Sequence, residues 1–180
     1  MTKFFTAGLV CALLIQTASA DNTIRASIRP ASSREKAPAF TLMNASGHAV
    51  RLSDYKGKVV VLNFWAVNCG GCRLELPSFV DINNSYKSKG LAVVGISMDI
   101  SYEDLKDAKE AWARVNPFLP AHHIDYTILM GDSVVEKAYQ TDALPATYLI
   151  DKDGRVAATY VGVVNKDNLE ANIKTVLTGR

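Results

Sequence analysis

The sequence NFWAVNCGGCRLELP, from Asn63 to Pro77, places two cysteines only two residues apart. It overlaps VVVLNFW (Val59 to Trp65), a run of β-branched, aliphatic and aromatic residues that predicts a strand buried on both faces. A helix is predicted from about Cys69 to Lys89, with Gly90 where a C-terminal stop belongs. A second apolar run, Leu91 to Ser97, predicts another buried strand. Strand, helix and strand of this kind indicate a parallel βαβ unit.

Short apolar runs and amphipathic stretches alternate along the rest of the chain. An apolar stripe predicts a helix from Tyr102 to Val115, and Asn116-Pro117 should end it. Two hairpins are predicted around the turn signals Asn44–Gly47 and Asp151–Gly154. The other predicted elements are strands at Tyr126–Met130, Thr147–Ile150 and Val156–Val161, and helices at Ser133–Tyr139 and Lys166–Leu177. The pattern predicts an α/β fold, with a central mixed sheet and helices on both faces.

The first twenty residues, MTKFFTAGLVCALLIQTASA, have the organisation of a secretory signal peptide. Lys3 supplies the positive start, and Phe4 to Ile15 is an apolar run shorter than a membrane-spanning helix requires. Ala18 to Ala20 offers the small-x-small pattern, so cleavage is expected after Ala20. Two alternatives stay open: retention as an anchor, and lipidation of Cys11. A cleaved signal predicts a periplasmic or otherwise extracytoplasmic protein, in a compartment where disulfides persist.

The composition is that of one globular domain, with 48% hydrophobic and 21% charged residues among 180. The net charge of +2 becomes +1 when the signal is removed, because 19 basic residues then face 18 acidic ones. So small a balance argues against a nucleic-acid partner. Residues 21–36 are polar and aperiodic, which predicts a flexible leader before a single domain at residues 37–180. We expect a monomer.

The two cysteines are predicted to lie at the start of a helix. Amide donors and the positive end of the helix dipole stabilise a thiolate there, so Cys69 should have a lowered pKa and be the attacking sulfur. Cys72 follows one turn later, roughly 4.5 Å along the helix axis. That spacing suits a Cys69–Cys72 disulfide that opens and closes. Between them, Gly70 and Gly71 loosen the helix start, while Gly71 keeps an amide that can face the sulfur.

Three other roles for the cysteine pair are compatible with the sequence. A purely structural disulfide gains little stability from so short a loop. A zinc site needs two more ligands, and outside the signal segment the chain offers only His48, His122 and His123. Two inert core thiols are the third alternative. A redox-active dithiol that needs no metal and no cofactor explains the spacing best.

The motifs resemble the thioredoxin fold, and within it the TlpA/ResA group of extracytoplasmic thiol–disulfide oxidoreductases. The matching stretches are NFWA, CGGC and ELP within 63–77, APAFTL at 37–42, LSDYKGK at 52–58 and LPATYLID at 144–151. The resemblance covers Ala37 to about Leu177, nearly all of the expected mature chain. It implies a thioredoxin fold with an N-terminal β-hairpin extension and a helical insertion.

Glu75 is the third candidate catalytic residue. It falls on the apolar stripe of its helix, where partial desolvation should raise its pKa so that it can take a proton from Cys72. The resemblance agrees, because this group has a buried glutamate at that place, whereas thioredoxin has an aspartate where this chain has Asn63. The alternative is a solvated glutamate of the first helical turn.

Further site residues follow from the resemblance. The proline that corresponds to Pro145 is cis and lies against the CxxC motif in thioredoxin folds, although the residues alone would favour a trans bond. The backbone of Leu144 could then pair with an extended substrate. Other expected substrate contacts are Gly70, Gly71, Trp65 and Asn68. Trp65 is also expected to pack in the core under the site, and Asn68 departs from the aromatic residue that the group usually has.

The resemblance implies an enzyme in which Cys69 attacks a partner disulfide and Cys72, helped by Glu75, resolves the mixed disulfide. It also implies the reducing direction, as in cytochrome c maturation, with protein disulfides as substrates and a membrane-borne electron donor. The alternatives are oxidation of partner thiols, a peroxiredoxin-like peroxidase and a Sco-like copper carrier. Peroxiredoxins carry Thr-x-x-Cys, with threonine where Cys69 stands, and Sco proteins prefer Cys-x-x-x-Cys with a distant histidine.

Overall fold

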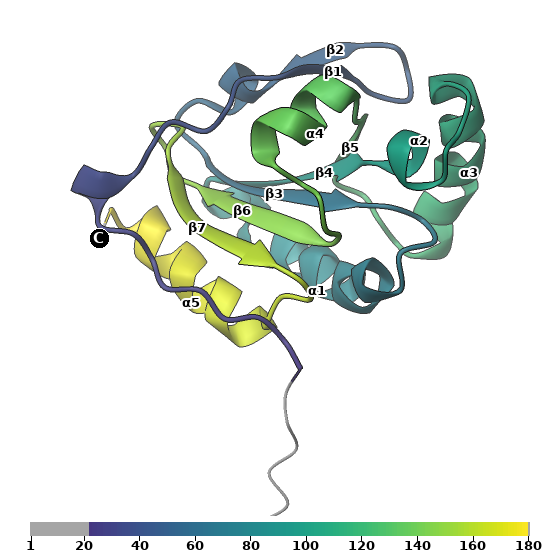
Figure 1. Cartoon of the computed structure of the whole chain (residues 1–180). Coiled ribbons are helices and arrows are strands. Elements are labelled where there is room, and N and C mark those ends of the chain that lie inside the picture. Colours follow the sequence, from purple (N-terminus) through teal and green to yellow (C-terminus); the bar gives the residue numbers. More distant parts are fainter. Residues whose placement is uncertain (1–21, 180) are drawn as a thin grey trace, which may run out of the picture.

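The computed structural model describes residues 22–179, so the expected signal segment and its cleavage site lie outside the described residues. A five-stranded sheet in the order β5-β4-β3-β6-β7 forms the centre of the molecule (Figure 1). The β4 and β5 strands run parallel to β3, whereas β6 is antiparallel to β3 and β7 is antiparallel to β6. The strands span Val59–Trp65 (β3), Leu91–Ser97 (β4), Thr127–Met130 (β5), Ala146–Ile150 (β6) and Val156–Val161 (β7).

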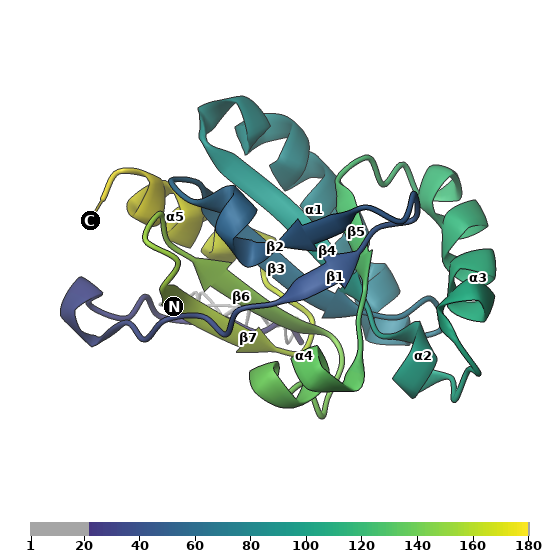
Figure 2. The same cartoon turned by 90° about the horizontal axis from the view of Figure 1, so that it is seen from above.

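Helices cover both faces of this sheet, as expected (Figures 1 and 2). One apolar cluster joins the sheet to α1, α3 and α5, and a second joins its other face to α4 and to residues of an N-terminal hairpin. These elements span Gly70–Tyr86 (α1), Ala108–Ala121 (α3), Lys166–Leu177 (α5), Ser133–Tyr139 (α4), Thr41–Met43 (β1) and Ala49–Arg51 (β2). Short 3-10 helices span Ala31–Ser33, Leu52–Tyr55 and Lys87–Lys89. The result is a thioredoxin-like α/β fold with an N-terminal hairpin.

The strand before the cysteines lies at the centre of the sheet. All seven residues of β3 are buried, because neighbouring strands pair with both of its edges and helices or the hairpin cover both of its faces. The helix predicted to end at Lys89 is α1 followed by the 3-10 turn Lys87–Lys89, and Gly90 ends it in the left-handed conformation with φ +89°. The chain therefore leaves the middle of the sheet directly into the CGGC helix.

The helix predicted from Tyr102 to Val115 is wrong in its bounds. A short helix, α2, spans Asp99–Tyr102, and α3 begins only at Ala108, after Asp107 accepts a hydrogen bond from the Glu110 amide. The α3 helix also continues through Pro117 to Ala121. A proline removes one helical hydrogen bond, but buried Val115 and Phe118 continue the apolar face on either side of it. Tertiary packing outweighs the local stop signal.

The segment expected to be a flexible leader is packed against the domain instead. Ile24 accepts from the Asn165 amide and donates to Val163, and the Val156 amide donates to Glu35. In Figure 1 this purple segment runs beside α5 and the β7 edge of the sheet. Because β7 is an edge strand, one row of its backbone donors and acceptors has no partner strand, and the leader supplies hydrogen-bond partners for that row. Hydrophobic periodicity does not reveal such backbone pairing. Within residues 22–179, no helix is both long and apolar enough to span a bilayer.

Candidate active site

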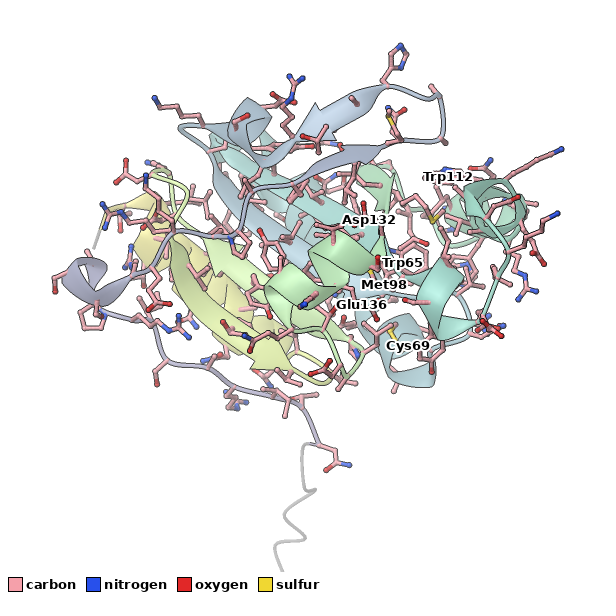
Figure 3. The ribbon with its side chains drawn as sticks, turned by 45° about the horizontal axis from the view of Figure 1, so that its top comes forward. Trp65, Cys69, Met98, Trp112, Asp132 and Glu136 are labelled. Atoms are coloured by element: carbon pink, nitrogen blue, oxygen red, sulfur yellow. A yellow bond between two sulfur atoms is a disulfide. The ribbon has the colours of Figure 1, made fainter. Side chains whose placement is uncertain are left out.

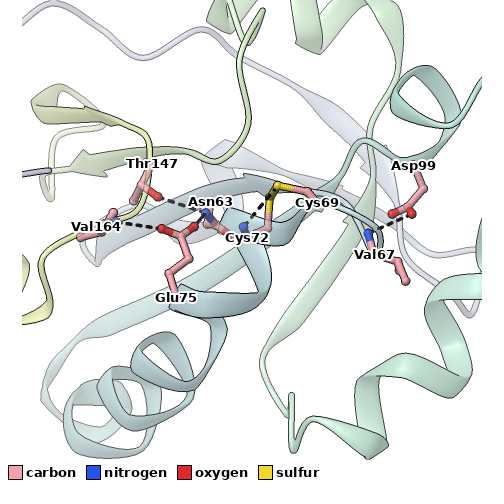
Figure 4. Close-up of a disulfide and its surroundings, with 8 residues drawn as sticks. All are labelled: Asn63, Val67, Cys69, Cys72, Glu75, Asp99, Thr147 and Val164. Atoms are coloured by element: carbon pink, nitrogen blue, oxygen red, sulfur yellow. Dashed lines mark hydrogen bonds between the residues drawn. A yellow bond between two sulfur atoms is a disulfide. The ribbon is translucent and has the colours of Figure 1, made fainter. Parts of the chain in front are cut away.

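The two cysteines lie where β3 turns into α1 (Figure 4). The Cys69 amide donates to the carbonyl of Ala66 (3.2 Å), which closes a tight turn after the strand. Cys69 is the N-cap residue of α1, and its Sγ accepts a hydrogen bond from the Cys72 amide (3.2 Å). The two sulfurs are joined in a disulfide, with Cα atoms 5.2 Å apart. The predicted pairing and the predicted position at a helix start are confirmed.

Glu75 lies one helical turn beyond Cys72, on the face of α1 that packs on the sheet. It is only 1% exposed, as its position on the apolar stripe predicted. Each carboxylate oxygen has a partner: Asn63 Nδ2 donates to Oε1 (2.8 Å) and the Val164 amide donates to Oε2 (3.0 Å). Burial raises the pKa of Glu75 to about 7, although both hydrogen bonds act in the opposite direction.

Asn63 connects Glu75 to the sheet. Its Nδ2 also donates to Thr147 Oγ1 (3.0 Å), because Asn63 and Thr147 face each other across the β3–β6 pair. Its Oδ1 has no hydrogen-bond partner among the described residues. From the sequence, Asn63 was noted only as the residue at the position of an aspartate in thioredoxin, and its hydrogen bond to Glu75 was not predicted. No sequence signal pointed to Val164, because a backbone amide makes that contact and any residue except proline supplies one.

Pro145 lies against the start of α1, and the Leu144–Pro145 peptide bond is cis, as the resemblance implied. A Cβ atom on Gly71 would stand 3.2 Å from Pro145 Cδ and 3.2 Å from Val163 Cγ2, whereas one on Gly70 would meet nothing within 4 Å. Of the two glycines in the motif, Gly71 is therefore the one whose backbone closely approaches its neighbours. The structure brings Cys69, Cys72, Glu75 and Pro145 together.

A polar hollow of about 250 Å³ opens beside Leu144. Met98 and Glu136 line it, on the side of the molecule that also carries Cys69 (Figure 3). Thr141 and Asp142, just before Leu144 in the chain, complete one of its walls. Leu144, the residue before Pro145, is half-buried and also lines this hollow.

Two expected substrate contacts differ in their exposure. Asn68 is exposed beside the disulfide and is free to meet a partner. Trp65 is fully buried, with its ring 5.5 Å from that of Phe118, so it has no surface to offer a substrate. Its expected core packing is confirmed and its expected substrate contact is wrong, because β3 is covered on both faces. His122 stacks on Phe118, with ring centroids 3.8 Å apart. Among residues 22–179, no three His, Cys, Asp or Glu side chains gather as a metal site would require.

A thioredoxin-like fold with a disulfide at the start of the helix that follows its central strand defines a class, the thiol–disulfide oxidoreductases. Comparison with known proteins gives the same class. The AhpC/TSA family matches residues 34–159. The thiol-disulfide oxidoreductase ResA of Geobacillus kaustophilus is 31% identical over 141 residues, covering 78% of this chain and 75% of that protein. The thioredoxin-like protein YneN of Bacillus subtilis is also 31% identical and covers 77% of each chain.

Solved structures agree. A putative thiol:disulfide interchange protein DsbE from Chlorobium tepidum is 32% identical, with a TM-score of 0.68 over 80% of this chain and 96% of that one. A putative thioredoxin from Neisseria meningitidis is 30% identical with a TM-score of 0.68, over 80% of this chain and 91% of that one. The chain belongs to the AhpC/TSA family and, within it, to the thioredoxin-like thiol–disulfide oxidoreductases of the TlpA/ResA kind. It is an oxidoreductase of that class.

Proposed function

We propose that this protein is an extracytoplasmic reductase of protein disulfides, in which Cys69, Cys72, Glu75 and Pro145 form the catalytic site. The observation that carries the proposal is the buried Glu75 carboxylate, with a pKa of about 7, one turn beyond Cys72 on the same helix. A purely structural disulfide has no use for a buried carboxylate beside it. A dithiol that must lose protons near neutral pH does.

In the first step the Cys69 thiolate attacks one sulfur of the partner's disulfide. A bond forms between Cys69 and that sulfur, the partner's own S–S bond breaks, and its second sulfur leaves as a thiolate. Amide donors at the start of α1 favour the Cys69 thiolate, and the Cys72 amide already points at that sulfur. We propose that the partner's chain lies along the backbone of Leu144, beside exposed Asn68 and the glycines Gly70 and Gly71.

In the second step the Cys72 thiol gives its proton to the Glu75 carboxylate, and the Cys72 sulfur attacks Cys69 Sγ. The Cys69–Cys72 bond forms and the bond to the partner breaks, so that the partner leaves with two reduced sulfurs. The protein is then oxidised by two electrons. A carboxyl with a pKa of about 7 is suited to accept this proton near neutral pH and to release it afterwards.

A reductase that works repeatedly needs an electron donor. In this proposal a membrane-borne dithiol reduces the Cys69–Cys72 disulfide by the same exchange in reverse. The reducing direction is what the resemblance of the motifs to the TlpA/ResA group implies, and we extend the proposal to a role like that in cytochrome c maturation. A strain that lacks this chain should then lose c-type cytochromes, and a Cys69→Ser variant should not restore them. Restoration by that variant would argue against the role.

The direction of the reaction is tested by the reduction potential of the Cys69–Cys72 pair, equilibrated with glutathione or with thioredoxin. A value near about −270 mV supports a reductase, and one near about −120 mV identifies an oxidant of partner thiols. Insulin reduction tests the site, because Cys69→Ser should abolish it. A peroxide-consumption assay and a copper titration of the reduced protein address the peroxidase and the copper carrier, and neither should respond.

A further inference from the structure

A second buried carboxylate lies on the opposite side of the disulfide from Glu75 (Figure 4). Asp99 is the first residue of α2 and is fully buried. Its Oδ1 accepts a hydrogen bond from the Val67 amide (3.0 Å), and its Oδ2 accepts one from Ser97 Oγ (2.8 Å). The disulfide-exchange steps leave this residue without a role. A buried carboxyl is costly to keep, so the contacts that it makes require an explanation.

Strand register explains why Asp99 meets this amide. The last residues of the parallel pair β3 and β4 are Trp65 and Ser97, which face each other. One residue further, the Met98 amide still donates to the carbonyl of Trp65 (2.8 Å). Beyond that point the two backbone segments separate, because the segment after β3 enters the loop toward Cys69 and the segment after β4 enters α2. If β4 continued, one of its backbone carbonyls would accept the hydrogen bond from the Val67 amide. The Asp99 side chain takes the place of that carbonyl and so links Val67 to the end of β4.

The other contacts of Asp99 hold its carboxylate in one orientation. Its own amide donates weakly to Ser97 Oγ (3.4 Å), so a single hydroxyl contacts both its side chain and its backbone. Burial raises the pKa of Asp99, and the hydrogen bonds from Ser97 and Val67 oppose that shift. The charges of Glu103 and Arg114 act on it in opposite directions, since Glu103 raises its pKa and Arg114 lowers it.

The loop held in this way is the one that carries the attacking sulfur. Its ends are fixed by backbone contacts, from Met98 to Trp65 and from Cys69 to Ala66, and Val67 lies between them. We propose that Asp99 is a positioning residue of the reaction: by holding the Val67 amide, it keeps Cys69 Sγ at the start of α1, where the amides stabilise its thiolate. This inference rests on the proposed role of Cys69 as the attacking sulfur.

The test follows the reaction of the Cys69 thiol with iodoacetamide from pH 4 to pH 10 in a Cys72→Ser background. With Asp99→Ala the titration midpoint should move to higher pH, and the rate at pH 7 should fall at least about tenfold, because a small displacement of a reacting atom is costly. Asp99→Asn keeps an oxygen for Val67, and Ser97 Oγ can accept from its amide nitrogen. It should restore the parent midpoint and a rate within about twofold.

Val135→Ala is the matched control, because Val135 is also buried but lies in α4, on the face of the sheet opposite α1. It should lower the melting temperature without moving the titration midpoint. If Asp99→Ala does not fold, Asp99→Ser removes the same contact with a smaller loss of polarity. An unchanged midpoint in Asp99→Ala or Asp99→Ser, a failure of Asp99→Asn to restore it, or an equal shift in Val135→Ala would overturn the inference. A parent thiol no more reactive than free cysteine would instead refute the role of Cys69.

Discussion

At the scale of single residues, the chemistry of Glu75 comes from its surroundings. A glutamate in water has a pKa well below neutral pH. Glu75 is instead only 1% exposed, because it is buried between the apolar face of α1 and the sheet. Two donors, from Asn63 and Val164, keep the buried carboxylate bound without making it strongly acidic. The same side chain in the first turn of a solvated helix would be a much weaker base near pH 7, because its pKa would stay near that of a free glutamate.

Replacing Glu75 by Gln should slow the second step of the reaction. In the parent protein, release of the partner from the mixed disulfide should speed up as the pH rises through about 7, where Glu75 loses its proton. The Glu75→Gln variant should be slower by about 10² above that pH and should lack this rise. Single-turnover reduction of a disulfide peptide from pH 5 to pH 9 measures both effects. A variant with the parent's pH profile would show that Glu75 is not the proton acceptor.

The same carboxyl should make stability depend on pH. Because burial raises its pKa to about 7 in the folded state, the folded protein binds this proton more tightly than the unfolded chain does. The stabilisation is present below the unfolded pKa and is lost as the pH rises to about 7, by about 3 kcal/mol in all. Urea unfolding of the parent and of Glu75→Gln at pH 4 and pH 8 isolates this contribution, which the variant should lack. Equal pH dependence in both proteins would contradict it.

The two glycines of the motif should respond differently to alanine. In Gly71→Ala the new Cβ would press on Pro145 and Val163 at 3.2 Å, so the variant should lose about 1 kcal/mol of stability and part of its insulin-reducing activity. Gly70→Ala is the control, because nothing lies within 4 Å of its Cβ position. It should be neutral or slightly stabilising, since alanine narrows the unfolded ensemble. Equal effects at the two positions would show that the close approach to Pro145 is unimportant.

At the scale of elements, the segment before the hairpin is the least expected part of the structure. Arg34 forms an ion pair with Asp151 (3.1 Å) in the β6–β7 turn, and both side chains are buried. The other carboxylate oxygen of Asp151 accepts from the amides of Asp153 and Arg155, which shapes that turn. The leader and the far end of the sheet therefore stabilise each other.

Removing Arg34 should be costly for this reason. Arg34→Ala leaves a buried carboxylate without its cation and should lower the free energy of unfolding by about 3 kcal/mol. The control is Lys166→Ala, which breaks a shorter but exposed pair with Asp81 (2.7 Å) and should cost less than about 1 kcal/mol. Urea unfolding at pH 7 compares the two. A loss no larger for Arg34 than for Lys166 would mean that the segment contributes little to the fold.

At the scale of the whole molecule, the proposed chemistry depends on the compartment. A chain that carries residues 1–20 should be recovered from the periplasm with Asp21 at its N-terminus, and a chain without them should stay in the cytoplasm. Cell fractionation with mass spectrometry of the purified protein measures both. Recovery of the uncleaved chain from the membrane fraction would support an anchor, and recovery from the cytoplasm would exclude export.

The sequence alone was sufficient for whatever depends on local pattern. Apolar runs and amphipathic periodicity predicted β3, β4, β7 and α5 at the bounds that the structure has, and CxxC after a buried strand predicted the disulfide at a helix start. These features follow from periodicity and from the geometry of a single turn.

Tertiary structure decided what depends on contacts between distant segments. It paired the leader with β7, carried α3 through Pro117, buried Trp65 out of reach of a substrate, and set the amides of Val164 and Val67 against Glu75 and Asp99. The sequence pattern could not predict these contacts, because every residue except proline carries the same backbone amide. Which acceptor an amide meets depends on how distant segments pack together.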